Sequence, residues 1–358
     1  MPRLRSFVIV VLAVPALLAG CALNELAVES DSTLAGTIVG DGASSQRAAQ
    51  DTWIAAFQLE HPLATVEYDP VGSGSGRDGF QAGASDFTGS DRPFTRDELG
   101  AGEFLSCVPG SPIIELPAYL SPIAIVVNVD GVAELNLDPP TIARIFSGAI
   151  EQWDDPQISD QNPGLDLPST VISAVHRADD SGVTENFTDY LHAAAPHDWP
   201  WDPSGIWPVD GGEAAQGTVG VSTAVTNGKD TIGYVDGSLA HGHTTVAVKV
   251  EDGYVPFSAD AAAAAVEASP LESGRTPGDL VIDLDRKGGH HGVYPIVLVS
   301  YLIGCESYLD TAKAELVRTY FDWVVSAEAQ SAAATSVGSA PLSPGLTDLA
   351  RDAVARIR

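Results

Sequence analysis

The sequence predicts an α/β protein built from two lobes, and three observations support this prediction. Short apolar strand-like runs alternate with helical segments, and loops rich in Gly, Ser and Asp connect them, which is typical of α/β units with a largely parallel sheet. The 358 residues accommodate two domains of ordinary size, and 44% hydrophobic residues are enough for sizeable cores. Two long apolar runs bracket the middle of the chain, where they can cross between the lobes.

The elements expected in the first third follow in chain order. The run LAGTIVG (34–40) is a strand, and an amphipathic helix follows it with apolar residues at helical spacing: Ala48, Ala49, Trp53, Ala56 and Phe57. ATVEYDPVG alternates like a strand, and SGSGRDGFQAG is a loop that opens a short helix. SDFTGSDRPF is a strand followed by a loop.

The remaining elements begin with the first long apolar run, LPAYLSPIAIVVNV (116–129). PPTIARIFSGAI (139–150) is a helix with Pro at its start, and TVISAVHR (170–177) is a strand that ends at Arg177. DTIGYVDGSLA (230–240) reads as strand, turn and helix start, and GVYPIVLVSYLI (292–303) is the second long run. A pair of amphipathic helices (308–335) and one further helix (346–357) close the chain.

The two long runs define the expected domains. If both cross between lobes, residues 35–120 and 300–358 form one discontinuous lobe, and residues 125–290 form the other. Cys107 and Cys305 would then both lie in the discontinuous lobe.

The N-terminus is interpreted as a bacterial lipoprotein signal. Arg3 and Arg5 precede an apolar run that is too short for a comfortable membrane span, and small residues precede Cys21. We expect a signal peptide over 1–20, lipidation at Cys21 and a polar tether over 21–34. The alternative is an ordinary secretory signal with a chance cysteine. An exported chain lies in an oxidising compartment, so the two remaining cysteines, Cys107 and Cys305, are expected to form a disulfide. The alternative is two separate buried thiols.

The charge excludes several partners. A net charge of -30 argues against nucleic acid or an anionic membrane surface as the main partner, and it repels anions at long range. An anion site must therefore be small, shielded from water and formed by hydrogen-bond donors that point at the anion. His241/His243 and His290/His291 lie in Gly-rich loops without acidic partners at ligand spacing, so we expect surface histidines and no metal.

Four polar loops follow apolar strands: GDGASS (40–45), GSGSG (72–76), TGSDRPF (88–94) and HRADDSG (176–182). In an open α/β sheet, ligands bind at the carboxyl ends of strands, and helix N-termini there bind anions. In the last loop Ser181 or Asp180 can cap a helix, Gly182 permits close approach, and Arg177 offers a forked donor set. The alternative is a capped surface helix whose Arg177 pairs with Asp179 or Asp180.

The glycine-serine loop is ambiguous by itself. Gly74, Gly76 and Gly79 match the G-x-G-x-x-G dinucleotide fingerprint, which is weak evidence alone, and a flexible turn explains them equally well. The pattern does not fit the G-x-S-x-G hydrolase motif, because Gly74 stands where that motif has serine.

Asp91 is out of place in an anion cradle unless the anion carries a proton. A carboxylate can accept the hydrogen of a P–O–H group, whereas sulfate has no such hydrogen to offer. A site that depends on one hydrogen bond can reject an analogue lacking it by factors on the order of 10⁴. The alternative is that Asp91 pairs with Arg92 at a loop surface.

Together these loops resemble the phosphate-binding proteins of high-affinity bacterial phosphate ABC transporters. The resemblance covers nearly all of the mature chain and rests on these motifs in this order: GDGASS, VGSGSG with ASDFTGSD, IFSGAIEQWDDPQI, HRADDSGVTENF and TIGYVDGS. It implies the type II periplasmic-binding-protein fold, in which two α/β lobes joined by a two-strand hinge close on one dehydrated phosphate.

The resemblance also implies the ligand set. The first lobe would contribute Ser44 and Ser45 through hydroxyl and N–H groups, Ser73, and Asp91 as the acceptor of the phosphate proton. The second lobe would contribute Arg177, Ser181, Gly182 and the N–H of Val183. The family often has a hydroxyl or acidic residue where Val183 stands, and Thr184 is a candidate to replace it.

The expected function is therefore a lipid-anchored, monomeric receptor on the outer face of the bacterial cytoplasmic membrane, which passes inorganic phosphate to an ABC permease. It is expected to be no enzyme and to need no cofactor. The alternatives are a receptor for sulfate or molybdate, a secreted phosphatase or serine hydrolase, and an adhesion protein that has lost transport.

Overall fold

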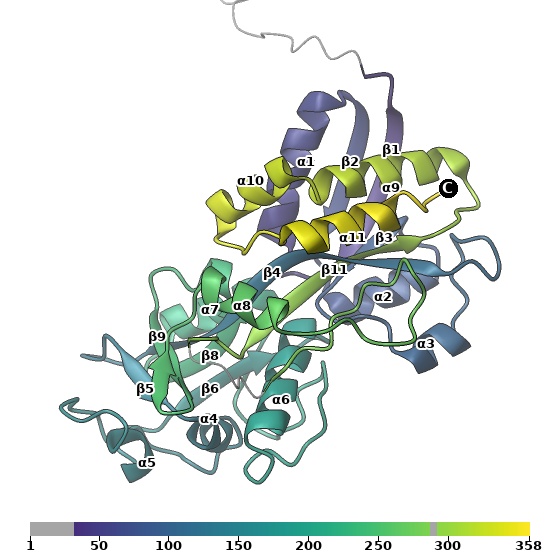
Figure 1. Ribbon diagram of the computed structural model, residues 1–358. Helices are drawn as coiled ribbons and strands as arrows, with labels where there is room; N and C mark the ends of the chain where they lie inside the picture. Colours follow the sequence, from purple (N-terminus) through teal and green to yellow (C-terminus); the bar gives the residue numbers. More distant parts are fainter. Residues whose placement is uncertain (1–31, 287–291) are drawn as a thin grey trace, which may run out of the picture.

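The computed structural model describes residues 32–286 and 292–358. The expected signal peptide (1–20), Cys21, most of the tether, His290 and His291 therefore lie outside the described residues. Two α/β lobes share one sheet with the strand order β2-β1-β3-β11-β4-β8-β6-β7 (Figure 1). Among the described residues, no helix has the length and apolar character that crossing a bilayer requires.

The first lobe carries the parallel strands β1 (Ala35–Gly42), β2 (Leu63–Asp69) and β3 (Phe87–Ser90), with β11 (Val297–Cys305) antiparallel to β3. Its helices are α1 (Arg47–Glu60), α2 (Ser73–Gln81), α3 (Arg96–Ala101), α9 (Thr311–Val324), α10 (Ala327–Val337) and α11 (Pro344–Val354). Figure 1 shows α1, α9, α10 and α11 gathered around these strands.

The second lobe carries β6 (Ser173–Arg177), which is parallel to β7 (Glu213–Ala215) and β8 (Thr231–Asp236). β9 (Thr244–Val250) pairs with β5 (Leu135–Leu137) and β10 (Gly253–Val255). Its helices are α4 (Pro139–Phe146), α5 (Pro156–Ser159), α6 (Gly182–Ala194), α7 (Gly217–Asn227) and η1 (Gly237–Leu239). Helix α8 (Ala259–Glu267) packs against β4 and β11.

One strand, β4 (Ile113–Asn128), belongs to both lobes. Residues 113–122 pair with β11, and residues 123–128 pair with β8. Every residue of β4 except the last is buried, which explains the continuous apolar run in the sequence. The second long run is expected to be a strand over 292–303, but the strand begins only at Val297. Just before it, the carbonyl of Ile296 accepts a hydrogen bond from the N–H of Ile123 at 2.8 Å.

A segment ahead of β11 lies along the first-lobe end of β4, although the sequence assigns residues up to 290 to the second lobe. The N–H of Leu280 donates to the Glu115 carbonyl at 2.9 Å, and the N–H of Glu115 donates to Gly278 at 3.1 Å. Arg275 pairs with the buried carboxylates of Glu115 (3.1 Å) and Asp279 (3.0 Å). Backbone and ionic contacts hold this segment, together with the burial of Leu280, Val281 and Ile282 in the core.

Aromatic side chains fill both cores. In the first lobe Phe57 and Phe87 pack against Tyr320, while in the second Phe146 and Phe187 pack against Tyr234. The expected helix over 139–150 ends at Phe146, because the chain turns through Gly148 with φ 76°.

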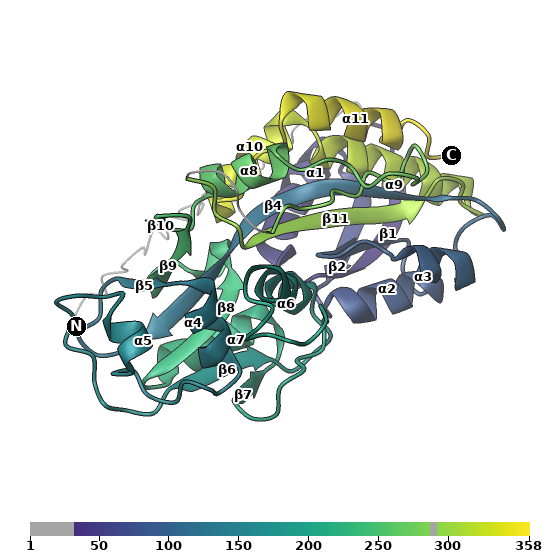
Figure 2. The same cartoon turned by 60° about the horizontal axis from the view of Figure 1, so that its bottom comes forward.

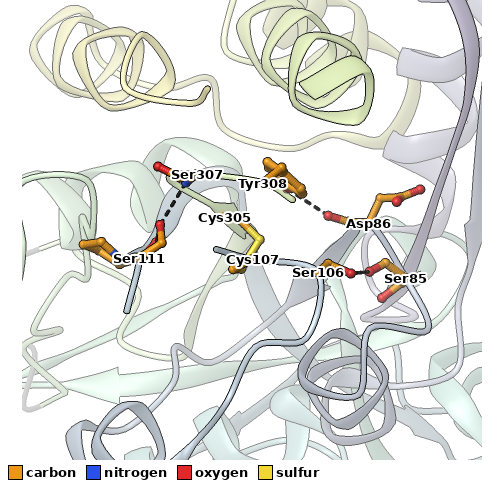
Figure 3. The surroundings of a disulfide bond; sticks show 9 residues. Ser85, Asp86, Ser106, Cys107, Ser111, Cys305, Ser307 and Tyr308 are labelled. Carbon is orange, nitrogen blue, oxygen red and sulfur yellow. Dashed lines mark hydrogen bonds between the residues drawn. A yellow bond between two sulfur atoms is a disulfide. The ribbon is translucent and has the colours of Figure 1, made fainter. Parts of the chain in front are cut away.

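Cys107 and Cys305 form a disulfide with an S–S distance of 1.98 Å (Figure 3). Nearby hydrogen bonds hold the adjoining loops: the N–H of Ser307 donates to Ser111 Oγ at 2.9 Å, and Tyr308 donates to the Asp86 carbonyl at 2.8 Å. The bridge therefore ties the end of β11 to the loop before β4, within the first lobe.

Candidate functional site

The four polar loops meet where the two lobes face each other, and Figure 2 shows α6 of the second lobe beside α2 of the first. One close approach is at Gly182, where a Cβ atom would lie 2.4 Å from Asp91 Cβ and 2.9 Å from Ser73 Oγ. Only glycine permits this approach. The structure therefore brings the start of α6 against the loops that follow β2 and β3.

The first loop places two serines at the carboxyl end of β1, just before α1. The hydroxyl of Ser45 donates to Asp91 Oδ1 at 2.6 Å, so it faces the loop after β3. The hydroxyl of Ser44 lies 3.1 Å from Thr218 Oγ1 and accepts a hydrogen bond from the N–H of Thr218 at 3.3 Å, so it reaches the second lobe.

The glycine-serine stretch is the first turn of α2 rather than a loop. Gly72 has φ 101°, a conformation that favours glycine, and the helix begins at Ser73. The N–H of Asp91 donates to Ser73 Oγ at 3.1 Å. Because the first N–H groups of a helix have no intrahelical partner, this end of α2 is an anion-attracting surface beside Asp91.

Asp91 is only 3% exposed, and its two oxygens have different surroundings. Oδ1 accepts hydrogen bonds from Ser45 and Ser300, both at 2.6 Å, whereas Oδ2 has no hydrogen-bond partner among the described residues. Burial raises the pKa of Asp91 to about 6, against the hydrogen bonds from Ser300 and Ser45, which lower it. Arg92, the alternative partner, pairs instead with Glu98 (2.9 Å) and Glu185 (2.7 Å).

Arg177 lies at the end of β6 and is also 3% exposed. Its guanidinium forms an ion pair with Asp179 and donates from Nη1 to Thr218 Oγ1 at 3.2 Å. Although burial acts to raise the pKa of Asp179, the hydrogen bonds and charge of Arg177 lower it. Arg177 can therefore pair with Asp179 and still belong to the candidate site, because Asp179 fixes the direction in which the guanidinium points.

Ser181 is the N-cap of α6, and its hydroxyl accepts a hydrogen bond from the N–H of Thr184 at 3.3 Å. Gly182 and Val183 follow as the first residues of the helix, where N–H groups lack intrahelical acceptors. The hydroxyl of Thr184, the candidate replacement at Val183, already has a partner: it lies 2.8 Å from the hydroxyl of Tyr234.

Three further contacts join the lobes. Asn186 of α6 donates to the Asp91 carbonyl at 2.7 Å, Arg92 pairs with Glu185, and the N–H of Gly74 lies 3.4 Å from the Asp180 carbonyl. The structure is therefore a closed arrangement in which the loops of both lobes are in direct contact.

Sequence reasoning missed several polar residues of this region: Gln46, Asn186, Thr218 and Ser300. Two of them left a signal. Ser300 is a hydroxyl in the middle of an apolar strand, and Gln46 and Gln50 are one helical turn apart, on the face of α1 that is buried. Thr218 has no distinctive context in the sequence. Trp153, for which no role was assigned, is fully buried and donates to the Asp230 carbonyl at 3.2 Å.

The arrangement suits an oxyanion better than a metal or a cofactor. Among residues 32–286 and 292–358, no group of His, Cys, Asp and Glu has the arrangement of a metal site. His241 is exposed and His243 half-buried near Ser222, as the surface interpretation of these histidines requires. Hydroxyls, helix N-termini and one guanidinium instead offer hydrogen-bond donors from several directions.

Comparisons with known proteins show the family of this chain. Residues 27–328 match the family model described as the PBP superfamily domain. The phosphate-binding protein PstS 3 of Mycobacterium leprae is 36% identical over 329 residues, which cover 86% of this chain and 87% of the relative.

Two solved structures share the fold. A high affinity periplasmic phosphate-binding protein bound with phosphate matches with a TM-score of 0.72 at 22% identity, over 88% of this chain and 93% of the other. A putative phosphate ABC transporter substrate-binding protein from Clostridium perfringens, with bound phosphate, matches with a TM-score of 0.61 at 17% identity, over 84% and 98%. The likeness of these two structures establishes the two-lobed architecture.

Proposed function

We propose a binding geometry and a mechanism from the premise that this chain belongs to the PBP superfamily and, within it, to the phosphate-binding proteins of phosphate ABC transporters. It has the periplasmic-binding-protein fold, and it is an extracytoplasmic receptor that binds inorganic phosphate for import. A sulfate or molybdate receptor and a phosphatase are not favoured, because the curated relative is named for phosphate binding rather than for an enzyme activity. We propose that the chain itself catalyses no reaction.

The proposed phosphate position is the point where the four loops meet. Ser44, Ser45, Ser73 and Asp91 would bind it from the first lobe, and Arg177, Ser181, Gly182 and Val183 from the second. The observation that carries the proposal is the packing of Gly182 against Asp91 and Ser73, which sets donors of both lobes around one point. The N-terminus of α6 and the forked guanidinium of Arg177 are suited to a tetrahedral anion.

Asp91 would select for phosphate. At pH values above its pKa of about 6, its carboxylate is ionised and can accept the hydrogen of a P–O–H group through Oδ2. Sulfate would place an unprotonated oxygen against the same carboxylate, where two acceptors face each other without a hydrogen.

The proposed mechanism is closure of the two lobes on the ligand. Phosphate bridges groups that belong to different lobes, so it binds the closed arrangement better than an open one and shifts the population towards it. The contacts Asn186–Asp91 and Arg92–Glu185 would add to the stability of that closed state. We further propose that lipidated Cys21 holds a monomeric receptor at the membrane, beside the permease that accepts the phosphate.

Isothermal titration calorimetry on purified protein, freed of bound anion, tests the proposal. We expect tight one-to-one binding of phosphate and binding of sulfate and molybdate that is weaker by at least about a hundredfold. An assay of phosphatase activity on the same sample should show no turnover. Equal affinity for sulfate, or no heat with phosphate, would refute the proposed function.

A further inference from the structure

A series of buried hydrogen bonds leads from the core of the first lobe to Asp91. Tyr320 donates to Gln50 Oε1 (2.5 Å), Gln50 Nε2 to Gln46 Oε1 (2.8 Å), Gln46 Nε2 to Ser300 Oγ (2.6 Å), and Ser300 Oγ to Asp91 Oδ1 (2.6 Å). The first four side chains are 0% exposed, so their polar atoms depend on one another rather than on water.

The direction of every bond in this series is fixed by one backbone oxygen. Gln46 Nε2 also lies 3.0 Å from the carbonyl oxygen of Tyr301, which can only accept. The Gln46 atom at that position must therefore be the amide nitrogen, and its oxygen must face Gln50. Gln50 then has to present its own nitrogen, and Tyr320 has to donate. The reverse assignment would place acceptor against acceptor at Tyr301.

The consequence reaches Asp91 through Ser300. Because Ser300 Oγ accepts from Gln46, its only hydrogen points to Asp91 Oδ1, the oxygen that also accepts from Ser45. A proton on Oδ1 would collide with the hydrogen of Ser300. The one oxygen of Asp91 with room for a shared hydrogen is therefore Oδ2.

We propose that Gln46 and Ser300 are positioning residues for anion selectivity: they hold Asp91 Oδ1 as an obligatory acceptor and reserve Oδ2 for the proton of the ligand. The proposal rests on the proposed function, in which Asp91 accepts the P–O–H hydrogen. Neither residue needs to touch phosphate. The hydrogen bond from Ser300 to Oδ1 also favours the ionised carboxylate over the neutral acid, which could donate from Oδ2 to an unprotonated oxygen and admit sulfate.

The electrostatic surroundings agree with this role. Burial raises the pKa of Asp91, and the hydrogen bond from Ser300 is the strongest influence that lowers it. The charged and titratable groups that face Asp91 or its loop from the packed elements are Tyr68 of β2, Arg77 of α2, Arg92, Glu98 of α3, Arg177 of β6, Glu185 and Asp189 of α6, Asp236 of β8 and Arg286. Of these, Arg177 lowers the pKa of Asp91, and Asp236 raises it.

The test compares Ser300→Ala and Gln46→Met with two matched controls. Ser85→Ala removes a buried serine whose hydroxyl donates to a different, half-buried carboxylate, that of Asp41, at 2.8 Å. Gln330→Met removes a buried amide whose partners are all backbone groups, those of Ala118, Val324 and Leu342. Each variant is titrated with phosphate and with sulfate across pH 5.5 to 8.5, after circular dichroism has verified its fold.

For Ser300→Ala we expect the preference for phosphate over sulfate to fall by about tenfold at neutral pH. We also expect the acid decline of phosphate affinity to begin about one pH unit higher, which corresponds to the loss of one hydrogen bond to a charged group. Gln46→Met should change the selectivity and the pH dependence in the same direction but by a smaller amount. In this variant Ser300 can still donate to Asp91, but no hydrogen bond from Gln46 fixes the direction of its hydroxyl. Both controls should keep the wild-type selectivity and pH profile.

An equal loss of phosphate and sulfate affinity, with an unchanged pH profile, would mean a merely structural role and would overturn the proposal. If Ser300→Ala does not fold, the selectivity of Gln46→Met decides between the same two outcomes. Failure of the proposed function would look different, because the wild-type protein itself would then show no preference for phosphate.

Discussion

Replacing Asp91 with asparagine should make the phosphate-free protein more stable. The pKa of Asp91 rises from 3.8 to about 6 in the folded protein, so its ionised form is disfavoured there. The shift of about two pH units corresponds to about 3 kcal/mol of unfolding free energy. This penalty is absent below pH 3.8, grows as the pH rises towards 6 and is constant above it. The Asp91→Asn variant avoids it, and the amide oxygen can still accept from Ser45 and Ser300.

Thermal unfolding by differential scanning calorimetry, in phosphate-free buffer, measures this effect. At pH 8 we expect Asp91→Asn to raise the midpoint by about 5–10 °C, and near pH 4 the gain should largely disappear. Saturating phosphate should reverse the order, because ligand stabilisation grows with affinity and the variant loses a hydrogen bond to the ligand. Asp78→Asn, at an exposed position of α2, removes the same charge and is the control. A variant that is no more stable than wild type at pH 8 would refute the reasoning.

Three further predictions concern binding and stability. Arg177→Met should weaken phosphate binding by more than about a hundredfold in calorimetry, since it leaves Asp179 uncompensated beside the anion, whereas Arg144→Met, on the surface of α4, should not. Replacing both Cys107 and Cys305 with serine should lower the unfolding free energy in denaturant titrations by up to about 5 kcal/mol and leave phosphate affinity intact, because the bridge closes a long loop within one lobe. Phosphate affinity should change by less than about threefold between low and high salt, and a steep decline would indicate an exposed electrostatic site.

The arrangement of strands and helices could be predicted because most segments carry a clear period. The buried run that becomes β4 and the helical spacing around Trp53 both appear in the structure. The course of residues 271–283 could not be predicted, because the buried apolar stretch 280–282 is too short to show a period. Isolated backbone contacts and the ion pairs of Arg275, which also position the segment, leave no periodic pattern either.

The predicted site residues are those that follow strands in sequence, since the carboxyl ends of parallel strands share an edge. The polar residues that complete the site come from elsewhere. Ser300 stands inside β11, and Thr218 follows β7, so their positions depend on pairings between distant segments. A polar residue within an apolar run is a usable signal for such positions, because burial without a partner is costly.

The charges of the proposed site suggest how a chain with a net charge of -30 would hold an anion. Asp179 offsets the charge of Arg177, and Asp91 adds a second carboxylate, so in this site Coulomb attraction between whole charges would not be the source of affinity. The remaining source is the dipoles of hydroxyls and helix N-termini, which act over short distances and are strong only where water is excluded. Since these donors belong to both lobes, closure is the condition under which they act together. In the proposed site, selectivity and affinity would thus have different origins: the donors would bind any small oxyanion, and the Asp91 carboxylate would favour the one that carries a hydrogen.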